Sequence, residues 1–454
     1  MKLFSLPLTL ALVLVAPVVY AIDLEEMQEM ALNNRQIIYQ YMTIVEQSEK
    51  DIVLARGGYY PSVDIGYTAN SLNETKLFED KENSVVTGRV SWNVFAGFRD
   101  KYALLSAKKL KEFEEYRLHG IKQDIQLNVA LAYLGVSERR ANLKVAEDAF
   151  QTLEKVYQDG ESRFQVGLVG KNELLKFRVD YDNAYINLEA ARADLEKSVN
   201  LLSRQVGSKI ELADLEFAAF KTLPPLMNKD EYIDRMLEER SEIKALEAVK
   251  SAASAAATAE QSGYYPQVDV VGSYSKYDDD FINTRGAMED EELRAQLVMS
   301  MNLFQGFTTE ARVARAKLET RSVQYELEEL KNDLITDLSN LHIDFEVSLA
   351  NVEIAKRSIE QAEENLRITQ LKYEEGLQQE SDLLDAITNL SRAQYNLVAV
   401  ERTAFSNNFQ LIRMVDGAYT PQGGTVKSPP QSMRIKKNPL QSTRTKKSTP
   451  QAKP

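Results

Sequence analysis

Residues 58–64 read GYYPSVD, and residues 263–269 read GYYPQVD, at an offset of 205. Three other elements recur in the same order at an offset of 205 or 209: LNNR at 32–35 matches LEER at 237–240, NVFAGF at 93–98 matches NLFQGF at 302–307, and FQVGL at 164–168 matches YEEGL at 373–377. A repeat of this length is too long for a solenoid, whose units have roughly 20–50 residues, and indicates a duplicated domain. We therefore expect two repeats, at 22–220 and 221–417.

Each repeat has the same order of elements. A helical pattern of about 35 residues runs up to the GYYP element, where proline cannot continue a helix. Two stretches follow in which apolar and polar residues alternate, a period typical of strands with one solvated face. The predicted strands are 60–72 and 84–96 in the first repeat, and 265–277 and 293–305 in the second.

Very long helical patterns follow the strands. Apolar residues recur at spacings of three and four from 99 to about 163 and from 308 to about 373. At 1.5 Å per residue each helix would be about 100 Å long, which implies a coiled-coil-like assembly. Second helices at 171–206 and 380–415 are predicted to fold back antiparallel. The fold class is therefore mainly α, with long antiparallel coiled-coil helices and a smaller β part.

The composition excludes several classes of protein. The chain has 454 residues, with 55 Lys and Arg against 68 Asp and Glu, so that its net charge is −13. This sign argues against nucleic acid as a partner, because phosphate binding requires a basic surface. After residue 21 the sequence has no apolar run near the ~20 residues that a membrane-spanning helix needs. The chain contains no cysteine, which excludes disulfides and an acylated N-terminal cysteine.

The two ends of the chain differ from the repeats. Residues 1–21 combine an early lysine, an apolar run and the tripeptide VYA at 19–21, which predicts a signal peptide cleaved before Ile22. The alternative is an uncleaved anchor. Residues 418–454 contain eight Lys and Arg, six prolines and no acid, a composition typical of a disordered segment. Such a basic tail either binds acidic partners or is a dispensable, solubilising end.

Four strands cannot close a barrel in a membrane. Each predicted strand has about 10 residues, the length of a tilted transmembrane strand, and lipid does not tolerate the two open edges of a four-stranded sheet. Three copies would supply twelve strands, enough to surround a lumen. Aromatic residues where strands meet helices are expected to form a girdle at the membrane interface, or alternatively to pack a junction core. These residues are Tyr59, Tyr60, Phe95, Phe98, Tyr264, Tyr265, Phe304 and Phe307.

The duplicated order of helix, GYYP, strand pair, FxGF and long helix, with a signal peptide and RFQVGLV at 163–169, resembles the TolC-type outer-membrane efflux proteins. The resemblance covers 22–417, and its most specific pieces are RFQVGLV and YEEGLQQESDLLDA at 373–386. It implies a homotrimeric conduit, with a twelve-stranded transmembrane β-barrel in outer-membrane lipid and an α-helical tunnel through the periplasm. It also implies docking to an inner-membrane ABC or RND transporter through a periplasmic adapter protein, and no catalysis.

The resemblance assigns roles to residues at the two helix breaks. Gly167 and Gly376 would lie at the periplasmic tips, where a residue without Cβ permits the chain to reverse. A latch that holds the closed tip would join Glu173 to Tyr373. Gln378 stands where the family can have an arginine, so the channel is expected either to close less tightly or to use Lys171 in the charged part of this latch.

Two aspartates, Asp382 and Asp385, match aspartate rings of the family. In a trimer they would place six carboxylates around a narrow pore. Such rings select and bind cations, and mutual repulsion raises the pKa of some of the carboxyl groups. In a single chain, acidic residues at helical spacing are more often a solvated face.

No catalytic motif accompanies these elements. The two histidines, His119 and His342, lie on separate predicted helices, and the sequence has no metal-binding or nucleophile motif, so neither an enzyme nor a metal or cofactor site is expected. The leading hypothesis is an export channel of the outer membrane, and the alternative is a soluble periplasmic coiled-coil adapter or structural protein. Type I secretion of proteins and efflux of small molecules both fit the first hypothesis. The missing acylation cysteine favours secretion.

Overall fold

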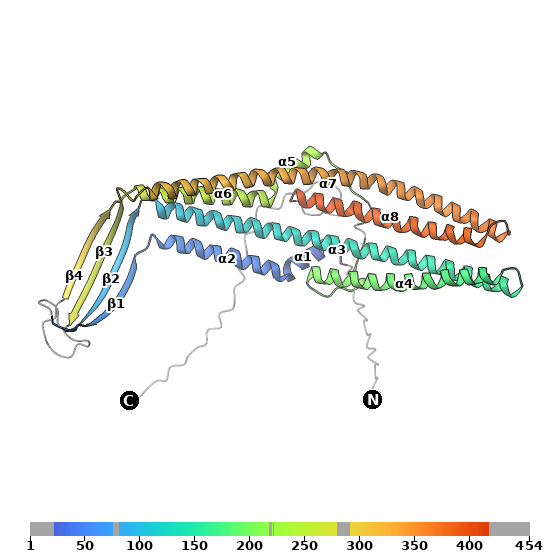
Figure 1. Cartoon of the computed structure of the whole chain (residues 1–454), viewed down its shortest axis with the longest axis horizontal. Coiled ribbons are helices and arrows are strands. Elements are labelled where there is room, and N and C mark those ends of the chain that lie inside the picture. The colour runs from blue at the N-terminus through green and yellow to red at the C-terminus, as the bar shows by residue number, and fades with distance from the viewer. Residues whose placement is uncertain (1–21, 76–80, 218–219, 221, 279–290, 417–454) are drawn as a thin grey trace, which may run out of the picture.

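The computed structural model of the chain describes residues 22–75, 81–217, 220, 222–278 and 291–416. The predicted signal peptide and the predicted basic tail lie outside these residues. Figure 1 shows an elongated molecule with a β-sheet at one end and two helical hairpin turns at the other.

The sheet contains four antiparallel strands in the order β1-β2-β3-β4. The strands are β1 (Ser62–Ser71), β2 (Glu82–Ala96), β3 (Gln267–Asp278) and β4 (Glu291–Ser300). All four were predicted, but β4 ends at Ser300 rather than at residue 305. Its pairing stops where Ser300 meets Gln267, the first residue of β3. Pro266 precedes that residue and has no N–H with which to extend the ladder.

The register gives the sheet one apolar and one polar face. The pairs Val63↔Val90, Val90↔Gly272 and Gly272↔Ala295 place these residues on the same face, and side chains alternate along each strand. The apolar face carries Val63, Ile65, Tyr67, Val86, Val90, Trp92, Val270, Tyr274, Leu293, Leu297 and Met299. The polar face carries Ser62, Asp64, Thr68, Arg89, Ser91, Asp269, Ser273, Arg294 and Gln296.

Sharp corners join the sheet to the long helices. At each corner a glycine and a phenylalanine take left-handed backbone conformations in succession: Gly97 and Phe98 before α3, and Gly306 and Phe307 before α7. The ring of Phe98 lies edge-on to Phe95, with centroids 5.2 Å apart. Seven of the eight junction aromatics are exposed, and Phe95 is half-buried.

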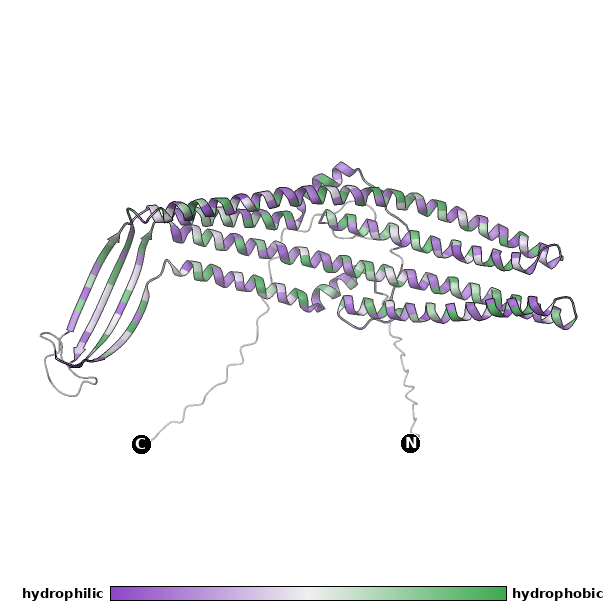
Figure 2. Ribbon diagram, viewed as in Figure 1, coloured by the Kyte–Doolittle hydropathy of each residue, from purple (hydrophilic) through white to green (hydrophobic). Residues whose placement is uncertain are grey.

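The predicted long helices are confirmed. Helices α3 (Arg99–Gln165) and α7 (Thr308–Glu374) have 67 residues each, and α4 (Lys171–Val206) and α8 (Glu380–Met414) return beside them. Figure 2 shows hydrophobic and hydrophilic residues interleaved along the helices. Within the described residues, no helix combines the length and apolar content that a membrane crossing requires.

The helical segment predicted before each GYYP element consists of two helices rather than one. The first repeat has α1 (Leu24–Asn34) and α2 (Gln36–Gly57), and the second has α5 (Lys229–Glu239) and α6 (Ser241–Glu260). The breaks fall at Arg35 and Arg240, whose backbones are extended. Each arginine donates a hydrogen bond to a carbonyl near the end of a returning helix: Arg35 to Arg204 at 2.7 Å, and Arg240 to Met414 at 3.1 Å. The extended residue thus redirects the chain and ties two helices together.

The core lies at mid-length, where α1 and α5 pack on the long helices. Leu24 of α1 and Tyr133 of α3 are fully buried in one cluster. Met236 of α5 and Phe345 of α7 are fully buried in the other. Phe405 of α8 belongs to the first cluster although it lies in the second repeat. The two repeats therefore pack against each other through the first cluster.

Candidate functional site at the hairpin tips

Both hairpins reverse through the same backbone motif. A glycine with a left-handed conformation follows each long helix, Gly167 with φ +79° and Gly376 with φ +74°. In each case the glycine N–H bonds to the carbonyl three residues back, and the next leucine N–H bonds to the carbonyl five residues back. This pattern is the Schellman motif, which favours glycine because a Cβ at a left-handed position is strained. The predicted turn residues are therefore the residues that end the helices.

Tyr373, near the end of α7, lies beside both helices of the first hairpin, α3 and α4. The Glu173 carboxylate on α4 lies close enough for its negative charge to act on the Tyr373 hydroxyl. Burial, followed by this carboxylate, raises the pKa of Tyr373. The Arg163 guanidinium of α3 lies 5.2 Å from the centroid of the Tyr373 ring. The two residues of the predicted latch are thus neighbours across the two hairpins.

Phe177 is a tip residue that the sequence analysis missed. It is 1% exposed, and its ring lies edge-on to Tyr373 at 6.4 Å. Gly160 of α3 makes room for it, since a Cβ at that position would come within 2.6 Å of the Phe177 ring. An isolated glycine inside a long helical pattern is a signal of close packing, and Gly160 is such a residue.

Charge at the tip comes from a residue other than the one expected. Gln378 is half-exposed in the turn after α7. The Lys176 ammonium of α4 lies 2.6 Å from the Glu380 carboxylate at the start of α8. This ion pair joins the two hairpins across 204 residues of sequence, a separation at which no local pattern indicates contact.

The two predicted ring aspartates occupy different environments. The Asp382 carboxylate accepts the backbone N–H of Gln379 at 3.3 Å, as part of a capping box at the start of α8. Asp385, one turn on, is exposed. Burial, and then the charge of Asp385, raises the pKa of Asp180 on α4. Asp180 therefore adds a third aspartate to this part of the tip.

Asp382 and Glu173 are equivalent residues of the two repeats. Each is the third residue of its returning helix, and the offset between them is 209. The charge of Glu173 acts across the hairpins on Tyr373, whereas Asp382 bonds back to its own helix. Within the described residues, no group of His, Cys, Asp and Glu is arranged to bind a metal ion.

A profile of the outer membrane efflux protein family matches residues 27–208 and 232–416. Outer membrane protein TolC of Escherichia coli (strain K12) is 24% identical over 310 residues, which cover 65% of this chain and 62% of that protein. TolC of Vibrio cholerae is 20% identical over 406 residues, 87% of this chain and 91% of that protein. The alkaline protease secretion protein AprF of Pseudomonas aeruginosa is 22% identical over 302 residues, 64% of this chain and 62% of AprF.

Solved structures with the same fold include CusC, with a TM-score of 0.75 and 15% identity over 89% of this chain and 94% of that chain. Another is VceC of Vibrio cholerae, with a TM-score of 0.74 and 17% identity over 87% of this chain and 97% of that chain. The family profile spans well over half of the 454 residues, in both repeats. The chain therefore belongs to the outer membrane efflux protein family, whose members are channels of the Gram-negative outer membrane and not enzymes.

Proposed function

We propose that three copies of the chain form a closed duct that exports substrates through the periplasm and the outer membrane. The apolar face of the sheet carries this proposal. In the single chain Ile65 is 82% exposed and Leu293 is 85% exposed. A continuous exposed face of this kind is unfavourable in water and suits lipid, while the polar face suits a water-filled lumen.

The open edges of the sheet support closure by further copies. Strand β1 leaves the helices and β4 returns to them, so the two edges run in opposite directions. Pairing β4 of one copy with β1 of the next would continue the antiparallel order around a ring. Three copies would give twelve strands and leave no edge exposed to lipid.

The long helices offer a matching lateral surface. At about 100° per residue, five exposed apolar residues of α7 lie within roughly 20° of one line along the helix: Leu318, Tyr325, Ile343, Val347 and Ile354. Leu175, Val179 and Ile186 form a shorter exposed stripe on α4. Figure 1 shows α7 and α4 along opposite long sides of the chain. Different surfaces on opposite sides are what a head-to-tail ring requires.

The hairpin tips would be the entrance of the duct. Val166, Leu168 and Leu377 are more than 70% exposed there, at 72%, 77% and 74%. We infer that they contact the helices of a periplasmic adapter, which joins the duct to an inner-membrane ABC or RND transporter. The similarity to AprF favours protein export by a type I system. Efflux of small molecules is the second candidate, and the description of the family favours it.

Asp382 and Asp385 would form carboxylate rings inside the closed tips, and Glu173 with Tyr373 would latch them. Ring carboxylates attract cations and repel anions. Asp382 would combine this role with its local cap on α8.

Purification and planar-bilayer recording test this function. The protein is expected to require detergent, to behave as a trimer and to conduct cations with block by divalent ions. Asp382→Ala/Asp385→Ala trimers, in which Asp180 is left unchanged, should lose most of the cation preference and the block. A monomer that needs no detergent would favour the soluble adapter. Unchanged selectivity and block would remove the rings from the proposal.

A further inference from the structure

The Lys176–Glu380 ion pair is well placed to hold the two hairpins together. Its atoms are 2.6 Å apart, and the two side chains are 55% and 19% exposed. Lys176 lies in the second turn of α4, and Glu380 is the first residue of α8. Apart from this pair, the described ion pairs of α4 join residues of α4 itself. The pair therefore acts between hairpins, where other α4 pairs act within one helix.

The pair lies near Tyr373, which itself neighbours Arg163 and Phe177. The negative charge of Glu380 is one of the causes that raise the pKa of Tyr373, after burial and Glu173. Separation of α8 from α4 at this point would break the ion pair and disturb the Tyr373 contacts together. We therefore expect the ion pair and the contacts of Tyr373 to form and break together.

A repulsive pair lies one turn farther from the tip. Asp180 of α4 faces Asp385 of α8 closely enough for the charge of Asp385 to raise its pKa, in addition to burial. Lys176, Asp180 and Asp385 line a single groove of about 500 Å³ between the two helices. Attraction and repulsion therefore act across the same interface, about one helical turn apart.

We propose that Lys176 and Glu380 form a closing contact of the gate, balanced against repulsion between Asp180 and Asp385. This inference rests on the proposed function of a gated duct. The ion pair holds α8 against α4 when the tips are closed, and it breaks when the hairpins separate. The aspartate pair lowers the free-energy cost of that separation. Loss of one exposed ion pair of this kind changes the ratio of open to closed channel by a factor of about two to three. Loss of three such pairs together, one in each copy, changes that ratio about tenfold.

Charge exchange tests the contact in single-channel recordings. Lys176→Glu and Glu380→Lys should each raise the ratio of open to closed channel about tenfold at rest. The double exchange, Lys176→Glu/Glu380→Lys, should restore closure. The control is Glu189→Arg/Arg192→Glu, which exchanges an ion pair within α4, at 2.7 Å, and should leave gating unchanged. Asp180→Asn should lower the open fraction.

The outcomes separate the two proposals. A wild-type protein that forms no channel contradicts the proposed function. A wild-type channel whose single variants stay closed, or whose double exchange stays as open as the single variants, contradicts the closing contact alone.

A crosslink gives a second, independent measurement. The chain has no cysteine, so Lys176→Cys/Glu380→Cys introduces the only two thiols. A short bifunctional thiol reagent should then hold the channel closed, and Glu189→Cys/Arg192→Cys, within one helix, should gate normally after the same treatment. A channel that opens freely with the 176–380 crosslink in place would overturn the proposal.

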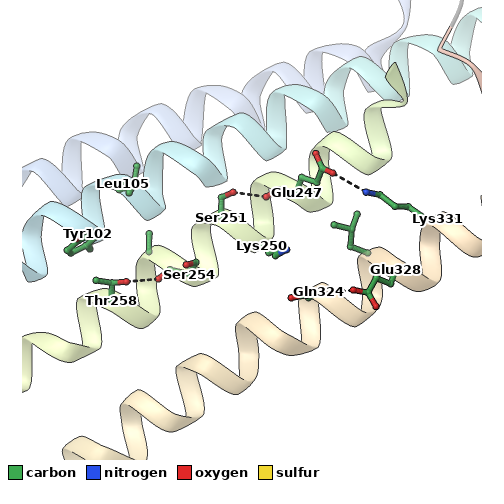
Figure 3. Close-up of a pocket in the computed structure, with 12 residues that line it drawn as sticks. Tyr102, Leu105, Glu247, Lys250, Ser251, Ser254, Thr258, Gln324, Glu328 and Lys331 are labelled. Atoms are coloured by element: carbon green, nitrogen blue, oxygen red, sulfur yellow. Dashed lines mark hydrogen bonds and ion pairs between the residues drawn. The ribbon is translucent and has the colours of Figure 1, made fainter. Parts of the chain in front are cut away.

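Figure 3 shows a larger groove, near the sheet end, between α3, α6 and α7. Its main polar contact joins Lys331 to Glu247 at 3.2 Å. Small residues of α6 and partly exposed side chains line the rest of this groove. The hairpin interface differs because it brings attractive and repulsive pairs together.

Discussion

The two mid-length joints, where a broken helix meets the end of a returning helix, share one backbone design but different chemistry. In the first joint Gly207 follows α4 with φ +79°, and Leu202 and Val206 are fully buried nearby. In the second joint Asp416 takes the equivalent position after α8, with φ +57°. It is 8% exposed and accepts hydrogen bonds from Ser241 at 3.0 Å.

The second joint is built around a buried arginine. Arg413 lies 2.6 Å from Glu242, 2.8 Å from Asp124 and 3.8 Å from Asp416, and its side chain is 8% exposed. Its equivalent at an offset of 209 is Arg204, which is exposed. Both joints bury an equivalent apolar pair, Leu202 and Val206 in the first and Leu411 and Val415 in the second, and the second joint adds a network of charges. Apolar contacts tolerate small shifts, whereas buried charges require every partner, so the second joint is the more sensitive to substitution.

The largest expected effect comes from Arg413→Ala. It leaves the Asp416 carboxylate buried without its arginine, and it removes the arginine partner of Asp124 and one of the two arginine partners of Glu242. The free energy of unfolding should therefore fall by about 3–5 kcal/mol. Urea unfolding in detergent, followed by helical circular dichroism, measures this change. The matched variant Arg204→Ala should change stability by less than about 0.5 kcal/mol. Equal effects at the two positions would contradict the contrast between the joints.

A smaller effect is expected at Gly207. An alanine there would adopt a left-handed conformation, and its Cβ would lie 3.1 Å from the Cβ of Asn34, so Gly207→Ala should cost about 1–2 kcal/mol. Gly135→Ala is the control, because a Cβ at Gly135 meets nothing within 4 Å on α3. That variant should be neutral or slightly stabilising. The same urea titration compares them, and a loss of stability only at Gly135 would refute this account of the turn.

The smallest effect concerns acid stability. Burial opposes ionisation of Asp416, but hydrogen bonds from His119 and Ser241, with the charges of His119 and Arg413, lower its pKa below the ordinary value of 3.8. A lowered pKa means that this carboxylate stabilises the fold above pH 3.8, and that the contribution is lost as pH falls through the folded pKa. Asp416→Gly, which copies the first joint, should therefore lose less stability between roughly pH 5 and pH 2, by under about 1 kcal/mol. An unchanged acid profile would show that the pKa of Asp416 is the same in the folded and the unfolded chain, which would contradict this account.

Most of the fold follows from local patterns in the sequence. Apolar residues recur every three to four positions along the two long helices, which have 67 residues each. The ends of the predicted and observed helices differ by only a few residues. The breaks at Arg35 and Arg240 were not predicted, because nothing in their local sequence forbids a helix. The sequence nevertheless contains a signal at both breaks, because LNNR and the matching LEER end at these two arginines.

The tip could be predicted only in part. Gly167 and Gly376 are set by backbone geometry, which a local motif encodes. The Lys176–Glu380 pair depends on two helices meeting across 204 residues, and charged residues are frequent on every helix of the chain. The cap formed by Asp382 was readable from its position three residues after Gln379.

The corners between sheet and helices have a mechanical consequence. At the first corner a Cβ at Gly97 would lie 2.8 Å from the Ser262 carbonyl oxygen, whereas at the second corner a Cβ at Gly306 would meet nothing within 4 Å. The first corner therefore leaves less room for movement between sheet and helix than the second. A load on α3 would reach the sheet more directly than a load on α7.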